Sequence, residues 1–388
     1  MKKAIIIPVY LKFSEPEELP YLEGLKLTKR AIESLKILED QDFHLILTVC
    51  FDQIGGSCGG EAFLKMDGFF RKELRNVGLK RGLVFSSHGL EQLRKHLGEW
   101  SFKDVDSLID LNGFSKIRNT SLLLAQALSM DAVIFIDNDE IIEDPHYLTI
   151  AVEYLNQRWN GKVVAGKGGF YVNPDGTILL PPRRPWWKFL WNKTKWMNRV
   201  WENILSAKER LVSSSMLLGG NLVLHQHLFQ RIPFDPHIPR GEDTDYLINA
   251  SHFGFCILFD KELRIKHLHP ERTETYFHEE LKGDIERFLY ERQKMKMGLN
   301  LHLDPYPGYF LKWTLYPKAI LTSLFLSLDY IRRRHWIKAK QCIGNIGLLL
   351  QEREKGWLKY LRFKRDWEMV MGKIRKEGMD ELLESCRI

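Results

Sequence analysis

The segment Ala132-Val-Ile-Phe-Ile-Asp-Asn-Asp-Glu140 joins a run of five apolar residues to an acidic end. The apolar run is rich in β-branched and aromatic side chains, which is typical of a strand buried on both faces of a sheet. Asp137 and Asp139 follow it directly, at the strand end where open α/β sheets bind ligands. Carboxylates there suit Mg²⁺ or Mn²⁺, which leave positions open for phosphate groups. An ordinary acidic turn is the alternative, because Asp and Asn are common in turns.

Two earlier apolar runs belong to the same predicted sheet. Residues 4–10 end in Pro-Val-Tyr, and residues 44–50 are followed closely by Asp52. Leucine and isoleucine at helical spacing lie between them, so the chain starts as strand, helix, strand. The loop after Asp52 holds four glycines but has neither GxGxxG nor GxxxxGK[ST] order. A dinucleotide fingerprint and a P-loop are therefore excluded.

Length and composition indicate one large domain with an appendage, or two domains. The chain has 388 residues, and 44% of them are hydrophobic, which is enough for a substantial core. Its five cysteines are scattered without a CxxC pair, which favours a reducing compartment and excludes an obvious zinc cluster. The apolar run after Met-Lys-Lys is too short for a signal peptide. We therefore expect a cytoplasmic protein.

The C-terminal part is basic and helical. Residues 306–388 hold 17 Lys or Arg against 9 Asp or Glu, whereas the rest of the chain is close to neutral. Predicted helices cover residues 277–297, 309–334, 337–351 and 357–376. The most apolar stretch, residues 319–328, is far shorter than the ~20 residues that span a bilayer. A peripheral membrane surface, packing against the rest of the chain, and a homo-oligomer all stay open.

Residues 113–129 have the pattern of a helix that starts with cations. We expect Ser115 to be its N-cap, with Lys116 and Arg118 in the first turn. Cations at that end oppose the helix dipole, which costs a few tenths of a kcal/mol. Their presence favours a bound anion such as a diphosphate. The alternative is that both side chains face water.

The middle of the chain contains a predicted hairpin and a basic aromatic segment. Residues 162–172 and 177–180 are expected to pair around the turn Asn173-Pro-Asp-Gly176. Residues 181–199 then interleave aromatic side chains with six basic residues and no acid. Because no base-reading motif accompanies them, we expect no nucleic-acid partner. A lid over a bound acceptor molecule, or one wall of the site that binds it, is favoured over a contact with lipid.

Two further stretches suggest site residues. Gly241-Glu-Asp-Thr-Asp245 starts a predicted helix with three acids, which is more than capping requires. Two strands are expected at residues 255–259 and 263–265, and the second leads to His267 and His269. Because residues at i and i+2 of a strand face opposite ways, at most one of these histidines is expected to meet a metal.

Seven short stretches stand in a characteristic order along the chain. They are Pro8-Val9-Tyr10, Asp52, Lys116 with Arg118-Asn119, Asp137-Asn138-Asp139, Gly219-Gly220-Asn221, Glu242-Asp243 and His267. In this order they resemble the GT-A glycosyltransferases of the family 2 type, over roughly residues 3–272. The resemblance implies an α/β fold with a mixed sheet flanked by helices. It divides the chain into a catalytic domain, residues 1–275, with a nucleotide-sugar half (about 1–140) and an acceptor half (about 141–275), and a helical extension, residues 276–388.

The same resemblance implies a role for each stretch. The nucleotide sugar would be held by Pro8, Val9, Tyr10, Asp52, Lys116, Arg118, Asn119, Asp137 and Asn138. Mn²⁺ or Mg²⁺ would be bound by Asp139, Asp137 and His267. The sugar and acceptor would meet Gly220, Asn221 and Glu242, and Asp243 would be the catalytic base.

The expected activity is metal-dependent transfer of a sugar from a nucleotide sugar to a hydroxyl acceptor, with inversion at the anomeric carbon. The acceptor is open: a saccharide, a lipid-linked molecule or a small molecule. One departure concerns the second strand, where the family's acidic pair and Gly-Ser are replaced by Asp52-Gln-Ile-Gly-Gly.

Two alternatives remain. A retaining enzyme acting on glycerate or phosphoglycerate would use Asp243 only to position the acceptor, and a membrane-surface binding module would have no turnover.

Overall fold

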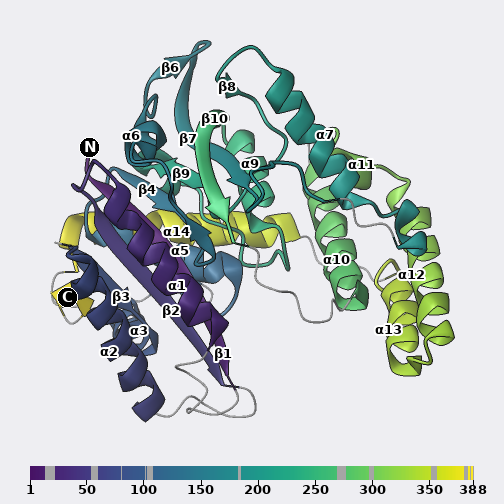
Figure 1. The fold of residues 1–388 in the computed structure, drawn as a ribbon, viewed down its shortest axis with the longest axis horizontal. Helices are drawn as coiled ribbons and strands as arrows, with labels where there is room; N and C mark the ends of the chain where they lie inside the picture. Colours follow the sequence, from purple (N-terminus) through teal and green to yellow (C-terminus); the bar gives the residue numbers. More distant parts are fainter. Residues whose placement is uncertain are drawn as a thin grey trace.

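In the computed structural model, a mixed β-sheet carries helices on both faces, and further helices follow from the C-terminal part (Figure 1). The structure describes residues 1–13, 22–53, 60–79, 81–100, 102, 108–181, 185–268, 277–296, 301–350, 356–379, 383–384 and 386–387. At residues 12–13, 51–53 and 60–65 it describes the backbone alone. The predicted roles of the Asp52 side chain, the glycine-rich loop and His269 therefore lie outside the described part. The expected fold class, α/β with a mixed sheet flanked by helices, is confirmed.

The sheet has the strand order β3-β2-β1-β4-β9-β7-β10-β5. These strands are β1 (Lys3–Phe13), β2 (His44–Gln53), β3 (Gly82–Phe85), β4 (Ala132–Phe135), β5 (Glu140–Ile141), β7 (Lys162–Val172), β9 (Leu222–His225) and β10 (Cys256–His267). Two short strands lie off this path: β6 (Arg158–Trp159) pairs with β7, and β8 (Leu211–Val212) pairs with β10. The mixture of parallel and antiparallel pairs brings distant segments to one end of β4.

The N-terminal half of the sheet is parallel. β1 lies between β2 and β4, and β4 pairs with β1 only as far as Ile6. Pro8 lies beyond that point, where a missing backbone N–H is tolerated more easily. β1 continues to Phe13 and so passes the predicted end at residue 10. β4 therefore ends beside an open stretch of β1, and this opening is where Asp137 follows.

In the other half of the sheet, strand pairing brings the glycines before β9 and His267 near the end of β4. β9 runs antiparallel to β4 with Leu222 opposite Phe135, so the glycines before β9 arrive at the end of β4. β10 is antiparallel to β5, and this pairing sets His267 opposite Glu140. Antiparallel pairing thus brings residue 267 next to the turn that follows β4.

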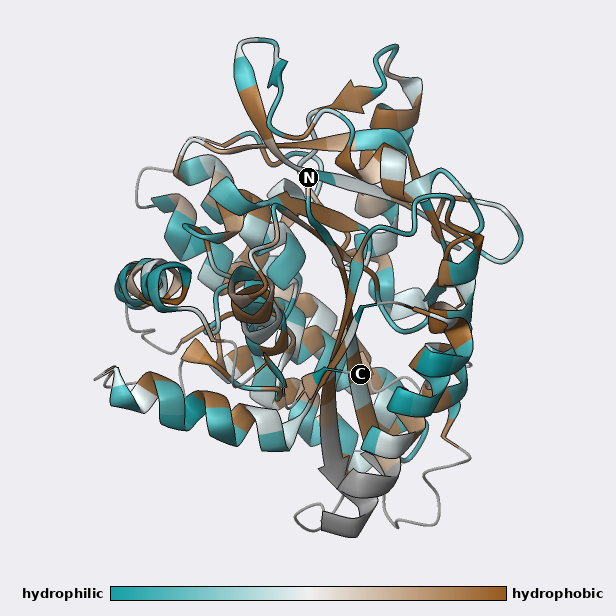
Figure 2. Cartoon of the chain, turned by 90° about the vertical axis from the view of Figure 1, so that its left-hand side faces the viewer, coloured by the Kyte–Doolittle hydropathy of each residue, from teal (hydrophilic) through white to brown (hydrophobic). Residues whose placement is uncertain are grey.

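Each face of the sheet has its own core, as the period of two along a strand requires. On one face Ile5, Ile7 and Val9 pack with α1 (Glu23–Ser34), η2 (Leu35–Ile37), α2 (Gly60–Val77) and α6 (Tyr147–Val152). On the other face Ala4 and Ile6 pack with α3 (Ser87–Glu99), α5 (Phe114–Ala127), α8 (Gln226–Phe229), α9 (Glu242–His252) and α14 (Gly356–Glu377). Figure 2 shows the hydrophobic strands enclosed between helices whose outer sides are hydrophilic.

A third core joins the sheet to the C-terminal helices. It gathers η3 (Trp186–Phe189), α7 (Lys193–Ser206), α10 (Phe277–Lys296), α11 (Gly308–Leu311), α12 (Leu315–Arg332) and α13 (Trp336–Gly347). Phe170 and Phe259 of the sheet belong to it. A fully buried ion pair adds a second link, because Lys294 of α10 lies 2.6 Å from Asp245 of α9. The start of α9 is therefore held from the C-terminal part of the chain.

The division of the chain at residue 275 stays a prediction, but one helix of the extension packs with the sheet. Trp357, Tyr360 and Trp367 of α14 are buried in the same core as α5 and α9. The Trp367 indole N–H donates to the carbonyl of Phe229 at 2.8 Å. α14 is thus part of the layer that covers the sheet, and α10 to α13 form the separate group visible at the right of Figure 1. Within the described residues, no helix is long and apolar enough to cross a membrane.

Three local predictions are wrong. Residues 177–180 form no strand: the turn at Asn173 is present, but β7 pairs with β6 instead. The two strands expected near residues 255–265 are one strand, β10, with an irregular register between Phe259 and Arg264. Ser115 is not an N-cap, because α5 already begins at Phe114, after Gly113 with φ 100°.

Candidate active site

The acidic turn after β4 is fixed by Glu140. The amide N–H of Asp137 donates to a carboxylate oxygen of Glu140 at 2.9 Å, and the amide of Glu140 donates to the Asp137 carbonyl at 3.1 Å. The Glu140 side chain is fully buried, and burial raises its pKa well above the usual range, with the charge of Asp137 adding to the rise. A buried carboxyl that closes the turn holds Asp137 and Asp139 at the mouth of the sheet.

His267 meets this turn through the pairing of β5 with β10. Its Nε2 lies 3.2 Å from Oδ2 of Asp139, and its ring stacks on Tyr171 with centroids 5.0 Å apart. The amide of Leu268 also donates to the Asp139 carbonyl at 2.8 Å. The ring is therefore oriented by the strand, by the aromatic face and by the turn.

Asp139, Glu140 and His267 could hold a divalent cation. One ligand atom from each lies within 4.8 Å of the others. Adjacent ligands of an octahedral ion at about 2.1 Å are about 3 Å apart, which fits the 3.2 Å between Asp139 and His267. Glu140 Oε1 is buried without a hydrogen-bond partner among the described residues, as a potential ligand atom would be. The two carboxylates suit Mn²⁺ or Mg²⁺.

Asp137 was also predicted as a metal ligand, but its carboxylate faces a cation of the protein. Arg118 donates from Nη2 to Asp137 Oδ1 at 2.9 Å. Asp137 is thus paired with the guanidinium, and Glu140 takes its place among the three grouped ligand atoms.

Arg118 is the buried centre of the site. Besides Asp137, its Nη1 donates to the Gly219 carbonyl at 2.8 Å, and its Nε lies 3.5 Å from the carboxylate of Glu242. Burial alone would lower the pKa of Arg118, but Asp137 and Glu242 outweigh burial and raise the pKa. One guanidinium therefore connects the acidic turn after β4 with the acidic start of α9.

Glu242 and Asp243 occupy the first turn of α9, after Gly241 in the left-handed region (φ 72°). Asp243 is half-buried, and its Oδ1 accepts the N–H of Thr244 at 2.6 Å. It interacts electrostatically with two buried guanidiniums, Arg118 and Arg287. A partly exposed carboxylate can accept a proton from a hydroxyl bound next to it.

The pKa of Glu242 gives a stability prediction. Burial raises this pKa from 4.5 to about 7; the charge of Asp243 adds to the rise, and Arg118 opposes it. Between these pH values the folded chain holds a proton that the unfolded chain has lost. The stabilisation is therefore fully present below about pH 4.5 and is lost as the pH rises through 7. Glu242→Gln should lose less unfolding free energy than the wild type between pH 5 and pH 8, by at most about 3 kcal/mol.

Urea unfolding at both pH values measures this difference. Glu279→Gln is the control, since Glu279 is an exposed acid in the first turn of another helix, α10. If the unfolding free energies of the wild type and Glu242→Gln change equally with pH, the raised pKa of Glu242 is contradicted.

Gly219 and Gly220 let the chain pass closely over two buried side chains. A Cβ at Gly219 would lie 2.5 Å from Nη2 of Arg118, and one at Gly220 would lie 2.4 Å from the Glu140 carboxylate. Gly220 also donates its N–H to the Tyr171 hydroxyl at 2.7 Å. These glycines therefore close the site over Arg118 and Glu140.

Gly220→Ala is accordingly expected to lower the unfolding free energy by about 1–3 kcal/mol, because Glu140 is buried and cannot move away freely. Gly372→Ala is the matched control. Gly372 lies inside α14 with nothing within 4 Å of an added Cβ, so alanine there should stabilise by about 0.5–1 kcal/mol. Thermal or urea unfolding gives both values. If Gly220→Ala and the wild type are equally stable, the contact between the added Cβ and the Glu140 carboxylate is relieved without loss of unfolding free energy.

Several predicted site residues use their side chains within the fold. Asn119 exchanges two hydrogen bonds of 2.8 Å with the backbone of Phe234, and Asn221 binds the carbonyls of Phe170 and Leu263. Both asparagines are fully buried. Their amide groups hold the segments before α9 and β9, and their contacts with nucleotide and sugar stay predictions.

Other predicted residues lie at the start of α5, in the turn after β4 and in β1. Lys116 lies 3.2 Å from Asp110 at the start of α5. The Asn138 amide donates to Thr28 of α1 at 3.1 Å. In β1, Val9 is a core residue, and the Tyr10 hydroxyl donates to Asn112 at 3.2 Å. These positions border the site at the ends of α5 and β1, and their nucleotide contacts stay predictions.

Three residues at the site were missed by sequence reasoning. Glu140 is the last residue of the segment 132–140, and its position as a third acid after the strand could have identified it. Tyr171 lies near the end of an expected strand but carried no motif. Arg287 has its guanidinium against Gly241 and bonds Glu291 at 2.7 Å. It comes from a helix that offered no motif, so only packing could reveal it.

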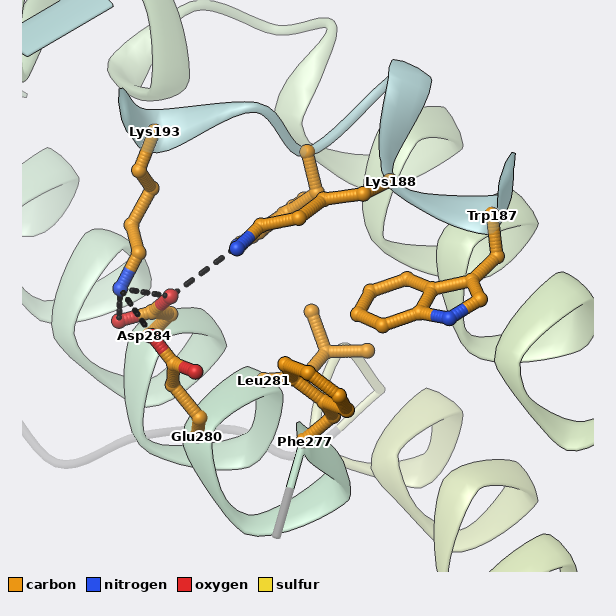
Figure 3. A pocket seen from close by; sticks show the side chains of 8 residues that line it. Trp187, Lys188, Lys193, Phe277, Glu280, Leu281 and Asp284 are labelled. Carbon is orange, nitrogen blue, oxygen red and sulfur yellow. Dashed lines mark hydrogen bonds and ion pairs between the residues drawn. The ribbon is translucent and has the colours of Figure 1, made fainter. Parts of the chain in front are cut away.

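A small pocket lies apart from these residues, between the 187–193 segment and α10 (Figure 3). Trp187 and Phe277 line one part, and Lys193 pairs with Glu280 and Asp284 at the other. The space open to a water-sized sphere is about 10 Å³, or roughly one water molecule, which is too small for a sugar. Trp187 and Trp191 are buried in the third core. This part of the aromatic segment is packing, and the preferred lid or acceptor wall finds no support there.

No protein-family model and no curated protein matches this sequence. Similar solved structures include the mannosyltransferase PcManGT from Pyrobaculum calidifontis in complex with GDP-Man and Mn²⁺, at 10% identity over 96% of this chain and 86% of that chain, with a TM-score of 0.48. S. aureus TarS matches at 15% identity over 98% of this chain and 56% of that chain, TM-score 0.41. Glucosyl-3-phosphoglycerate synthase from Mycobacterium tuberculosis in complex with Mn²⁺, uridine-diphosphate and phosphoglyceric acid matches at 15% identity over 74% and 76%, TM-score 0.38. Since these TM-scores are below 0.5, the activities of those proteins do not carry over.

Fold and site together define an α/β protein with a candidate divalent-cation centre at the mouth of a mixed sheet. The centre consists of Asp139, Glu140 and His267. A second acidic group, Glu242 and Asp243, is joined to it through Arg118.

Proposed function

We propose that this protein is a metal-dependent glycosyltransferase of the GT-A type that moves a sugar from a nucleotide sugar to a hydroxyl acceptor. The observation that supports this most is the guanidinium of Arg118, which pairs with Asp137 of the turn after β4 and with Glu242 of α9. In the proposal, this one buried cation links a candidate phosphate-binding metal centre with the first turn of α9, where the candidate base Asp243 lies. Inverting transfer from a nucleotide sugar uses both: charge compensation for the leaving diphosphate and a base for the acceptor.

In this proposal Asp139, Glu140 and His267 hold Mn²⁺ or Mg²⁺. The bound cation would offset the negative charge that develops on the diphosphate as the bond to the sugar breaks. Arg118 keeps Asp137 paired and fixes the turn, so that Asp139 is presented in one orientation. The nucleotide would lie along the ends of β1 and β2, near Tyr10 and Asp52, as the resemblance implies.

Asp243 would accept the proton of the acceptor hydroxyl as that oxygen attacks the anomeric carbon, which gives inversion. Glu242 would position other hydroxyls of the acceptor. Asp243 interacts electrostatically with the guanidiniums of Arg118 and Arg287, which belong to the same site. A cytoplasmic location, a saccharide, lipid-linked or small-molecule acceptor, and a homo-oligomer stay predictions.

Thermal shift with a panel of nucleotide sugars, each with Mn²⁺ and with EDTA, tests the proposal. We expect at least one donor to raise the melting temperature only when the metal is present, because the diphosphate and cation bind together. Transfer with that donor, followed by NMR of the product, then assigns the anomeric configuration. A retained configuration would favour the alternative in which Asp243 positions a small acceptor. No shift with any donor, and neither transfer nor hydrolysis, would refute the enzyme assignment.

A further inference from the structure

The outer face of α12 is apolar and exposed. Leu321, Leu324, Leu328 and Ile331 recur every three or four residues, so they lie on one side of the helix. Their exposed fractions run from 38% for Leu324 to 55% for Leu328. The residues between Lys318 and Asp329 carry no charge. This helix buries its other side in the third core and leaves an aliphatic stripe outside.

Two aromatic residues extend the stripe. Trp186 and Phe189 of η3 are 52% and 62% exposed, and their rings lie 5.8 and 5.5 Å from that of Phe325 in α12. The Trp186 indole N–H donates to Asp329 at 3.0 Å, which holds η3 against the helix. We name the six residues Trp186, Phe189, Leu321, Leu324, Leu328 and Ile331 the α12 patch. Single exposed apolar residues are ordinary, but a continuous patch from two elements marks an interaction surface.

The surroundings of the α12 patch are strongly basic. Residues 305–350 hold seven Lys or Arg and one acid, Asp329. That acid is buried and lies 2.9 Å from Arg333, so its charge is already compensated. Arg334, in the turn between α12 and α13, and Lys340 of α13 are exposed. Exposed positive charges therefore lie close to the α12 patch, in the turn after α12 and in α13.

We infer that the α12 patch docks this protein on an anionic membrane surface. Aliphatic and aromatic side chains would enter the headgroup layer, while Arg334 and Lys340 would meet acidic headgroups. Because the described residues include no helix that could span a bilayer, the helix lies on the membrane and not across it. A second copy of the chain fits this surface less well, since a symmetric contact would bring two basic regions together. The inference stands apart from the glycosyl transfer and does not depend on it.

Flotation of the full-length chain with lipid vesicles tests this docking. Vesicles of phosphatidylcholine alone are compared with vesicles that contain one third phosphatidylglycerol. We expect binding to the anionic vesicles and about tenfold weaker binding at 0.5 M salt, where surface charges are screened. Leu328→Glu should reduce binding to the anionic vesicles about tenfold or more, because it places a charge in the exposed stripe that would enter the headgroup layer. Met369→Glu is the matched control: Met369 is 51% exposed on α14, outside the patch, and its substitution should change nothing.

A second variant tests the basic residues without touching Asp329. Arg334→Gln combined with Lys340→Gln should weaken binding about 30-fold, since each cation near an anionic surface contributes about fivefold. Arg362→Gln with Arg365→Gln, two exposed cations of α14, should have little effect. Thermal melting confirms that each variant is folded.

Three results would overturn the inference. If the wild-type chain fails to float with anionic vesicles, the α12 patch is not a membrane-docking surface. Equal binding by Leu328→Glu and the wild type would place any contact elsewhere. Sedimentation that shows a dimer without lipid, converted to monomer by Leu328→Glu, would assign the patch to a second copy of the chain.

Discussion

Replacing Asp243 by asparagine is expected to lower the rate of sugar transfer about 10²- to 10⁴-fold, the usual contribution of a general base. The asparagine keeps the shape of the side chain and can still accept the Thr244 N–H that Asp243 accepts. It cannot take a proton from an acceptor hydroxyl. Donor affinity should change little, because the candidate metal ligands, Asp139, Glu140 and His267, are untouched. Steady-state kinetics with a saturating donor, together with calorimetric binding of the donor, separates the two effects.

Glu279→Gln is the matched control for this experiment. Like Asp243, Glu279 is an acid in the first turn of a helix, but its side chain is 68% exposed at the start of α10. The control therefore removes the same charge from a similar helix position and should leave the rate unchanged. A near-wild-type rate for Asp243→Asn would remove the base from the proposal, and Glu242 or a retaining mechanism would then have to explain transfer.

Replacing Asp139 by asparagine is expected to abolish the metal dependence of donor binding. Loss of even a supporting partner of a metal ligand costs about 10- to 100-fold in metal affinity, so loss of a carboxylate ligand should cost at least that much. In the same variant His267 loses the carboxylate 3.2 Å from its Nε2. Calorimetry with Mn²⁺ and with EDTA should give a large difference for the wild type and nearly none for Asp139→Asn.

Glu143→Gln supplies the control for the metal prediction. Glu143 follows the same turn and pairs with Lys266, but it is 58% exposed and lies outside the grouped ligand atoms. It removes one negative charge from the same region without touching a candidate ligand. If both variants bind the donor with unchanged metal dependence, the cation is not held by Asp139.

The sequence alone determined the strands that run toward the site. The segments around Ile6, Leu47 and Ile134 are continuous apolar runs, and such runs need burial on both faces wherever they occur in the chain. Asp137, Asp139 and the acids after Gly241 could be identified from the sequence because of their local positions. The first two follow a buried strand, and the others stand at the start of a predicted helix. Four C-terminal helices were predicted from apolar spacing for the same reason. The structure divides the second of them, residues 309–334, into α11 and α12.

Only the tertiary structure decided which of those acids face one another. His267 reaches Asp139 because β10 pairs antiparallel with β5, and the register of a pairing depends on both partners. Glu140 lies among the candidate ligands and Asp137 does not, because buried Arg118 draws Asp137 toward Glu242. The local pattern fixes where a strand ends and which residue types follow it. Which side chains then share a buried cation also depends on contacts between distant residues, such as Arg118 with Glu242, and these exist only once the chain has folded.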